Sequence, residues 1–385
     1  MTHQTAEPHV ARTIPFNRPG LVGNELDYVR DAIERGHISG DGVYTRRCEA
    51  LLSSLLGGSR ALLTTSCTDA LEMAALLTDI QPGDEFVVPS FTFVSTANAF
   101  VLRGAAPRFA DIRPDTLNID ETRLGDIINS RTRAIVIVHY GGIACEMDEI
   151  LAIARERNIP VIEDNAHGLF GAYRGQPLGT FGATSTLSFH ETKNVFCGEG
   201  GALVVNDAAL AARSEVLRDK GTNRRRFIQG EVDKYTWLDV GSSFVPSDIL
   251  AAFLFAQLEK RAEVQAARAN VWRHYRDELT PWAERQGIAL PVVPAHCAPA
   301  YHLFHLLLPS PEERRRFIDH MASRGVQAIF HYLPLHVSPM GQQLGGRAGD
   351  CPVAESVSER LVRLPFFSSM SDAEQMHVID AALAF

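Results

Sequence analysis

The stretch TSTLSFHETKNVFCGEGGALVVND, residues 184–207, shows both the fold class and a candidate site. Its ends, residues 184–190 and 200–207, are short apolar runs that predict buried strands. Between them lie Lys193 and a glycine-rich turn. Of the 37 basic residues only four are lysines, at positions 193, 220, 234 and 260. Lysine can form a Schiff base with a carbonyl compound and arginine cannot, so a lysine at a strand end predicts a chemical role.

Similar strand-like runs alternate with helical stretches over residues 60–206. This alternation predicts an α/β fold with a mostly parallel sheet. Ligands bind such sheets at the carboxyl ends of the strands, so the residues after each strand are candidates for a site. The other predicted strands are residues 60–66, 84–90, 133–140 and 159–165.

The pattern changes after about residue 245. Residues 247–279 predict one long helix or a kinked pair of helices, followed by strand-like runs and a helix at the C-terminus. We therefore expect a large α/β domain over residues 1–250, and a linking helix with a smaller α+β domain over residues 251–385.

Composition excludes several classes of function. A formal net charge of −9 argues against nucleic acid as a partner, and the basic cluster 224–226 is too short to change this. We see no signal-peptide core and no membrane-spanning run, so we expect a cytoplasmic protein without a membrane partner. The six cysteines are scattered and suggest neither disulfides nor a zinc site. Pro334 would break a helix presenting His331 and His336 together, so we expect no metal.

The strand ends supply groups that pyridoxal phosphate (PLP) requires. Backbone N–H groups at a helix start favour a phosphate, and Ser66, Cys67 and Thr68 lie between a predicted strand and helix, although a capping role is the alternative. A carboxylate must keep the pyridine nitrogen protonated, and Asp164 lies where the run PVIE, residues 160–163, ends; Asp111 is a competitor, and an ordinary helix-capping role is the other alternative. Two aromatic residues, Phe91 and Phe93, could face the ring or pack in the core.

The order of phosphate loop, aromatic residue, aspartate and lysine resembles that of fold-type-I PLP enzymes, the aspartate aminotransferase superfamily. More narrowly, the chain resembles the DegT/StrS-type sugar-nucleotide aminotransferases. Within them it is most similar to the group that forms dTDP-4-amino-4,6-dideoxygalactose. The resemblance extends from about residue 14 to beyond residue 340 and is carried by segments that include NRPGLVGNELDYVRDAIERGHISGDG, PSFTFVSTANAFVLRGA, HYGGIACEMD, SFHETKN, GEGG and FHYLPLH.

This resemblance implies a role for each matching residue. Lys193 would carry PLP covalently and Asp164 would pair with the pyridine nitrogen. Phe93 would stack on the ring, His167 would reach the PLP hydroxyl, and Ser188 would hold the phosphate together with Cys67 and Thr68. The chain departs from many relatives at Val245, where an asparagine reaches the phosphate of the partner subunit; Ser242 or Ser243 could substitute, or nothing does. Asn165 also replaces the usual alanine or cysteine, a change of little expected consequence.

The implied reaction moves an amino group from glutamate to C4 of a nucleotide-linked 4-keto-6-deoxyhexose, dTDP-4-keto-6-deoxyglucose in the group named above. The implied active unit is a homodimer. Candidate contacts to the nucleotide sugar are Arg224, His331, Tyr332 and His336.

Four alternatives to this reaction stay open or are disfavoured by the residues present. A 3-keto sugar aminotransferase and a catalytically silent regulator share the implied fold. A related sugar dehydratase would carry histidine in place of Lys193. A nicotinamide dehydrogenase is disfavoured because no G-x-G-x-x-G follows a strand.

Overall fold

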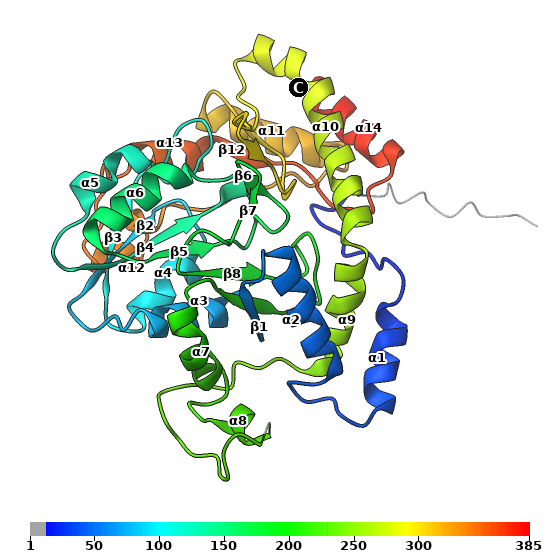
Figure 1. Ribbon diagram of the computed structural model, residues 1–385. Coiled ribbons are helices and arrows are strands. Elements are labelled where there is room, and N and C mark those ends of the chain that lie inside the picture. Colours follow the sequence, from blue (N-terminus) through cyan, green and yellow to red (C-terminus); the bar gives the residue numbers. More distant parts are fainter. Residues whose placement is uncertain (1–12, 229) are drawn as a thin grey trace, which may run out of the picture.

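A seven-stranded sheet forms the centre of the chain in the computed structural model, which describes residues 13–228 and 230–385 (Figure 1). The strand order is β1-β9-β8-β5-β4-β2-β3. The five strands from β8 to β3 are parallel, whereas β9 runs antiparallel between β8 and β1. The predicted α/β fold with a mostly parallel sheet is confirmed. The strands are β1 Arg60–Thr64, β2 Glu85–Pro89, β3 Ala106–Ala110, β4 Thr132–Val138, β5 Val161–Asp164, β8 Thr184–Ser188 and β9 Gly201–Val205.

Helices cover both faces of this sheet, because successive strand residues point to opposite sides. Phe86 of β2 packs in a core with α3, Cys67–Leu77, and α4, Val94–Val101. Its neighbour Val87 packs on the other face with α6, Met147–Arg157. The result is a three-layer arrangement. The carboxyl ends of β1, β2, β4, β5 and β8 lie at one edge, since β1 and β8 are both antiparallel to β9.

A third core joins the N-terminal helices to the middle of the chain. Helices α1, Glu25–Glu34, and α2, Val43–Leu55, pack against α9, Asp248–Glu259. Helix α10, Arg261–Gln286, follows α9 after a break at Lys260. The stretch therefore forms a pair of helices, the second of the two predicted arrangements.

The C-terminal part has its own core around α10 and a two-stranded sheet. Ile14 from the N-terminal segment joins this core and pairs with Val326. The residues after Gly325 form only isolated bridges there instead of a strand. The domain division after residue 250 stays a prediction. The elements are β11 His305–Leu307, β12 Leu361–Arg363, α11 Pro311–Ser323, α13 Pro352–Arg360 and α14 Asp372–Leu383.

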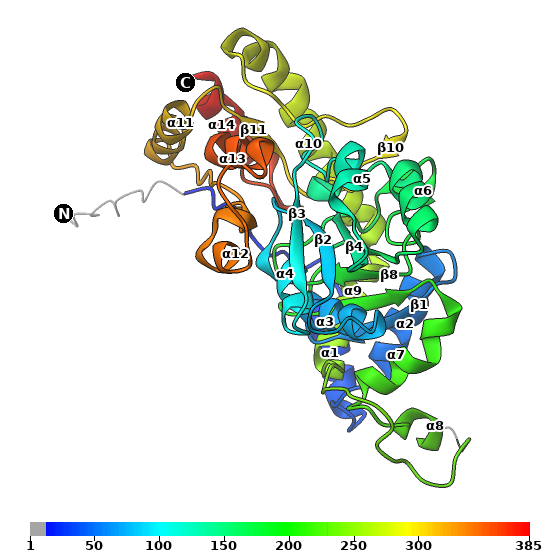
Figure 2. The same cartoon turned by 90° about the vertical axis from the view of Figure 1, so that its left-hand side faces the viewer.

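A loop carrying α8, Arg224–Ile228, extends away from the rest of the molecule in both views (Figure 2). We call residues 222–228 and 230–240 the arm. Across the described ranges, no helix has the length and apolar character needed to cross a membrane. The remaining elements are η1 Glu121–Arg123, α5 Leu124–Ile127, η2 Tyr140–Gly142, β6 Ala172–Tyr173, β7 Gln176–Pro177, η3 Ala208–Leu210, α7 Ala211–Arg218, β10 Cys297–Ala298, η4 Leu335–Val337 and α12 Pro339–Gln343.

Candidate active site

A cavity of about 790 Å³ opens at the edge of the sheet where the parallel strands end. Its walls come from the strand ends on one side and from residues 329–332 and β12 on the other. Residues from ten predicted positions, far apart in the sequence, meet in this lining. They are Ser66, Cys67, Thr68, Phe93, Asp164, His167, Ser188, Lys193, His331 and Tyr332.

The N-terminus of α3 forms one end of the cavity. Ser66 is the N-cap in an extended conformation, and its Oγ accepts a hydrogen bond from the Asp69 amide at 3.0 Å. The first turn of a helix leaves its N–H groups without partners in the helix, so the amides of Cys67 and Thr68 are available to an anion. Burial raises the pKa of the Cys67 thiol, so this side chain stays neutral. Both the capping and the anion-binding interpretation of Ser66 are therefore compatible with its position.

Gly201 keeps this helix start in place. A Cβ atom at this position would lie 2.4 Å from the Cys67 amide nitrogen and 2.4 Å from the Ser66 carbonyl carbon. Real atoms do not approach so closely, hence any larger residue would push the turn between β1 and α3 away from β9. The last glycine of the GEGG motif is required by close backbone approach rather than by an unusual backbone angle.

Asp164 lies at the carboxyl end of β5, near the middle of the sheet. Its Oδ2 accepts from the Thr96 hydroxyl at 2.7 Å and its Oδ1 from the Ala166 amide at 3.2 Å. Burial raises the pKa of this carboxyl, and these hydrogen bonds oppose the rise. The competitor Asp111 instead accepts from two amides, those of Val353 and Ala354, at the start of α13. Of the two aspartates only Asp164 lines the cavity.

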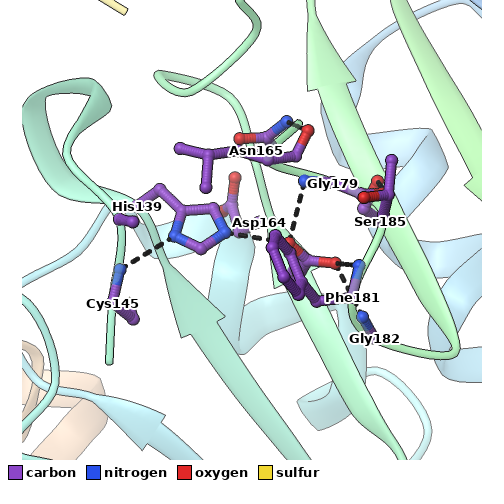
Figure 3. Close-up of polar contacts among 12 residues, drawn as sticks. His139, Cys145, Asp164, Asn165, Gly179, Phe181, Gly182 and Ser185 are labelled. Carbon is purple, nitrogen blue, oxygen red and sulfur yellow. Dashed lines mark hydrogen bonds and ion pairs between the residues drawn. The ribbon is translucent and has the colours of Figure 1, made fainter. Parts of the chain in front are cut away.

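A buried polar network lies on the face of the sheet opposite to the Asp164 side chain and holds the end of β5 in place (Figure 3). The Glu163 carboxylate accepts from the amides of Gly179, Phe181 and Gly182 at 2.7–2.8 Å. It is also 2.9 Å from Nε2 of His139. The Nδ1 of that ring accepts a hydrogen bond from the Cys145 amide. The proton of the neutral ring is therefore on Nε2, which donates a hydrogen bond to Glu163. Glu163 thus joins two loops to the strand that presents Asp164.

Lys193 follows β8 in the loop that returns to β9. Its amide donates a hydrogen bond to the His190 carbonyl at 2.9 Å and so closes a turn. The Lys193 side chain lines the cavity. The side chain is partly exposed to the open cavity, but protein surrounds its amine. Burial lowers the pKa of Lys193 to about 8, and the negative charge of Asp164 opposes this shift. The neutral form, which a nucleophile or base requires, is therefore a minority near physiological pH but far more abundant than for an unperturbed lysine.

The other three lysines lie on the surface. Lys220 pairs with Asp219, and Lys260 pairs with Glu263. Lys234 is exposed on the arm. None of these three side chains lines the cavity.

Aromatic and histidine rings form a further part of the cavity wall. The Nδ1 of His167 accepts from the Gly141 amide at 3.3 Å, and its Nε2 lies 3.3 Å from the Tyr332 hydroxyl. Burial lowers the pKa of His167 and His331 well below the usual value, so both rings are neutral. His331 stacks on Tyr332 with the ring centres 3.6 Å apart. Phe93 lines the cavity and is half exposed, whereas Phe91 is buried in the core and outside the lining.

Two predicted sugar contacts and the substitutes for the missing asparagine lie outside the cavity lining. Arg224 is on the arm and pairs with Asp219 at 3.5 Å. His336 is buried, and its two ring nitrogens contact Ser90 and Glu355 at 2.6 and 2.9 Å. In the described part of the chain, no cluster of three or more histidine, cysteine or acidic side chains is placed to hold a metal ion. Val245, Ser242 and Ser243 do not line the cavity either.

Some residues of the lining were not predicted. His302 stacks on His167 with the ring centres 4.1 Å apart, and its Nδ1 bonds to Asn194, the neighbour of the lysine. Arg363 reaches the cavity from β12. Neither lies in a motif, and their approach depends on how the C-terminal core packs over the sheet. The local sequence contains no signal for this. Ser95, by contrast, lies within a segment that carried the resemblance and binds Thr68 at 2.8 Å.

The chemistry of the donor set fits PLP. One end of the cavity offers helix N-terminal amides and hydroxyls for a phosphate. Asp164 offers a buried carboxylate for a protonated ring nitrogen, and Lys193 offers an amine with a lowered pKa for the aldehyde. His167 and Phe93 offer a ring donor and an aromatic face.

Comparisons with known proteins agree with this fit. Residues 20–383 match the DegT/DnrJ/EryC1/StrS aminotransferase family. The chain is 33% identical over 371 residues to the GDP-perosamine synthase of Caulobacter vibrioides, covering 94% of this chain and 95% of that protein.

Two solved structures share the fold over nearly the whole chain. The aminotransferase TlmJ from Streptoalloteichus hindustanus superposes with a TM-score of 0.89 at 29% identity, over 97% of this chain and 98% of that one. Spr1654 from Streptococcus pneumoniae, solved in a PLP form, gives a TM-score of 0.89 at 25% identity, over 97% and 98% of the two chains.

Proposed function

This chain belongs to the DegT/DnrJ/EryC1/StrS aminotransferase family, and we propose that it transfers an amino group from glutamate to C4 of a nucleotide-linked 4-keto-6-deoxyhexose. As a member of that family it is a PLP-dependent enzyme of fold type I. The observation that carries the proposal is the position of Lys193. It is the one lysine that lines the described cavity, and its amine is partly neutral near pH 8.

We assign the cofactor contacts as follows. Lys193 would hold PLP covalently, and Asp164 would pair with the ring nitrogen. His167 would contact the ring hydroxyl, and Phe93 would cover the ring. Phosphate binding would fall to Ser66, Cys67, Thr68 and Ser188. Bound PLP supplies an electron sink for the charge that develops on the donor's α-carbon, and it stores the amino group between the two half-reactions.

The chain's own residues then move and hold the protons. In its neutral form Lys193 Nζ accepts the proton from the α-carbon of glutamate and later returns a proton on the sugar side. The buried Asp164 carboxylate stabilises positive charge across the site in both half-reactions. The neutral rings of His167, His331 and Tyr332 keep this wall free of competing charge.

We propose dTDP-4-keto-6-deoxyglucose as the acceptor and the axial (galacto) 4-amine as the product. The support is the sequence resemblance to the group that makes dTDP-4-amino-4,6-dideoxygalactose. His331 and Tyr332 would contact the sugar from the cavity wall. A GDP-linked acceptor is the second candidate, because a relative that is 33% identical is named a GDP-perosamine synthase. The position of amination follows from where the nucleotide is anchored, so a 3-keto acceptor is the alternative within the same reaction class.

We further propose a homodimer as the active unit. Arg224 lies on the arm, away from the cavity of its own chain, so its predicted contact with a nucleotide requires a second copy. The arm also exposes large apolar side chains that an interface would cover. These are Phe227, Ile228, Tyr235, Trp237, Leu238 and Val240. His336 would act indirectly, by holding residues 331–336 against Ser90.

The experiment is incubation of the PLP-loaded protein and glutamate with four acceptors: the 4-keto and 3-keto 6-deoxy sugars, each linked to dTDP or GDP. NMR of the products identifies the aminated carbon and its configuration. Amination of the dTDP-linked 4-keto sugar to the axial amine is expected. Amination of the 3-keto sugars alone would refute C4 as the position of amination. A preference for the GDP-linked sugars would refute dTDP as the nucleotide of the acceptor.

A further inference from the structure

The side-chain amide of Asn194, the residue after Lys193, has an orientation that its neighbours settle. It is buried, and its Nδ2 donates to the Ala300 carbonyl at 2.7 Å and to Gln265 Oε1 at 3.1 Å. A carbonyl oxygen can only accept, so Nδ2 must point there. The Oδ1 of Asn194 therefore faces His302 and lies 2.9 Å from its Nδ1. This bond ties the loop that carries Lys193 to the segment around residue 302.

The same bond decides which nitrogen of the His302 ring carries the proton. Burial lowers the pKa of His302 well below its usual value, so the ring is neutral. Because the Asn194 oxygen can only accept, Nδ1 of the ring donates and Nε2 keeps its lone pair. The ring is thus held in one tautomer and one orientation.

The His302 ring also covers the ring of His167. The two rings are stacked, with their centres 4.1 Å apart and their planes at 20°. His167 has the opposite tautomer, since its Nδ1 accepts from the Gly141 amide and its proton is therefore on Nε2. That Nε2 lies 3.3 Å from the hydroxyl of Tyr332, another residue of the cavity lining.

The groups around His167 are neutral or positive. Burial is the main cause of its lowered pKa, and the positive charges of Lys193 and Arg363 add to the effect. A ring that lost its cover would be better hydrated, so its pKa would rise toward the usual value of about 6.5. The titratable groups that contact His167 or act on it are Tyr140, Lys193, His302, His331, Tyr332 and Arg363.

We propose that His302 is a positioning residue, which ties the loop of Lys193 to the His167 ring and holds that ring with its Nε2 proton directed into the cavity. One side chain from the C-terminal part then fixes two groups that follow different strands, β8 and β5. The amine that would carry PLP and the ring that would contact its hydroxyl are kept at a constant separation. The inference rests on the proposed function in that it takes from it the assignment of Lys193 and His167 to PLP.

Two substitutions separate the two contacts of His302. Asparagine can place an amide N–H where the Nδ1–H lies, but it has no ring to cover His167. Phenylalanine keeps a ring over His167 and cannot donate to Asn194. The test compares His302→Asn and His302→Phe with the wild-type protein and with His377→Asn. His377 is exposed on α14 outside the cavity lining, so it provides the matched control.

Two measurements are made, neither of which uses a sugar or depends on turnover. The ionisation of His167 is followed in the PLP-free protein by NMR of the histidine ring protons between about pH 5 and 8. Its signal is assigned by its loss in His167→Asn. The dissociation constant of PLP is measured by absorbance titration.

We expect the two variants to fail in different ways. In His302→Asn the midpoint of His167 should rise toward about 6.5, whereas in His302→Phe and His377→Asn it should stay at the low wild-type value. The PLP dissociation constant should rise by about 10-fold in His302→Phe, because the buried Asn194 oxygen is left without a donor. In His302→Asn it should stay within about twofold of the wild-type value, since the bond to Asn194 is retained.

An unchanged midpoint of His167 in His302→Asn overturns the proposal. So does a PLP dissociation constant that is unchanged in His302→Phe, or one that is raised equally in both variants. If a variant does not fold, ring-nitrogen NMR of the wild-type protein decides, with the His302 signal assigned by its proximity to the His167 ring: a proton on Nδ1 of His302 supports the proposal and a proton on Nε2 overturns it. A protein that meets these expectations but aminates no nucleotide sugar refutes the proposed function alone.

Discussion

At the scale of single residues, burial changes the ionisation of the two groups on which the chemistry depends. It lowers the pKa of Lys193 to about 8 and raises that of Asp164. The two effects have one origin, since a low-dielectric cavity disfavours both charged forms. The charge on each group partly offsets the shift that burial causes in the pKa of the other group. The pair therefore keeps an amine that is easily deprotonated beside a carboxylate that is ready for a positive partner.

The lowered pKa of Lys193 predicts the pH dependence of cofactor capture. Only the neutral amine attacks an aldehyde, so the rate at which PLP-free protein binds PLP should rise with pH with a midpoint near 8. An unperturbed lysine would place this midpoint at about 10.4. Stopped-flow absorbance measures the rate. In Asp164→Asn the midpoint should fall below that of wild type, because the carboxylate favours the charged amine; a rise would contradict this assignment.

Replacing Asp164 by asparagine should keep the fold and remove most turnover. An amide can still accept from Thr96, but it cannot hold a proton on the ring nitrogen, and such a loss costs about 100-fold or more. Steady-state kinetics with glutamate measures the change. Asp111→Asn is the matched control, since Asp111 caps α13 outside the cavity and should leave turnover nearly normal. Equal losses in both variants would show that neither aspartate has a special role.

At the scale of elements, the site depends on the turn between β1 and α3 packed on the first residue of β9. Gly201→Ala should destabilise the protein by about 1–3 kcal/mol, because the new Cβ has no room beside Cys67 and Ser66. PLP affinity should fall as the helix start shifts. Urea unfolding and PLP titration measure the two effects.

Gly125→Ala provides the control for this substitution. Gly125 lies in α5 with no atom near the position of a new Cβ, so alanine should be tolerated there. An unchanged stability and PLP affinity in Gly201→Ala would show that the close approach has no functional weight.

Much of this arrangement could be predicted from local sequence. The buried strands are short apolar runs, so their ends at Asp164, Ser188 and the turn after β1 could be found by pattern alone. The choice between Asp164 and Asp111 could not, because both follow strands and only packing shows that Asp111 caps α13. His302 and Arg363 were missed for a similar reason. Their approach to the cavity is set by long-range packing of the C-terminal core.

At the scale of the whole molecule, the arm is the surface whose apolar exposure lacks a partner within the described chain. Trp237 on the arm is 78% exposed, although its Nε1 donates to the Asp239 carbonyl. The proposed homodimer would cover it. Scattered exposed apolar residues are common, but six of them on one projecting loop are not.

Trp237→Ser should therefore weaken the dimer without unfolding the chain. Removing a buried interfacial tryptophan costs about 2–4 kcal/mol, or at least about 30-fold in dissociation constant. Light scattering over a concentration series should give twice the 42.3 kDa chain mass for the wild type and a shift toward one chain for the variant. Val292→Ser, an exposed apolar residue away from the arm, should leave the mass unchanged. A fully active wild-type monomer would remove the dimer from the account.

The most direct test of the active-site assignment is to identify which lysine carries the cofactor. The PLP-loaded protein is reduced with borohydride, which fixes the cofactor to the side chain that holds it, and digested for mass spectrometry. The account predicts one modified residue, Lys193, and no fixed cofactor in Lys193→Ala, while Lys220→Ala remains fully labelled. Labelling of Lys220, Lys234 or Lys260 in the wild-type protein, or undiminished labelling of Lys193→Ala, would contradict it.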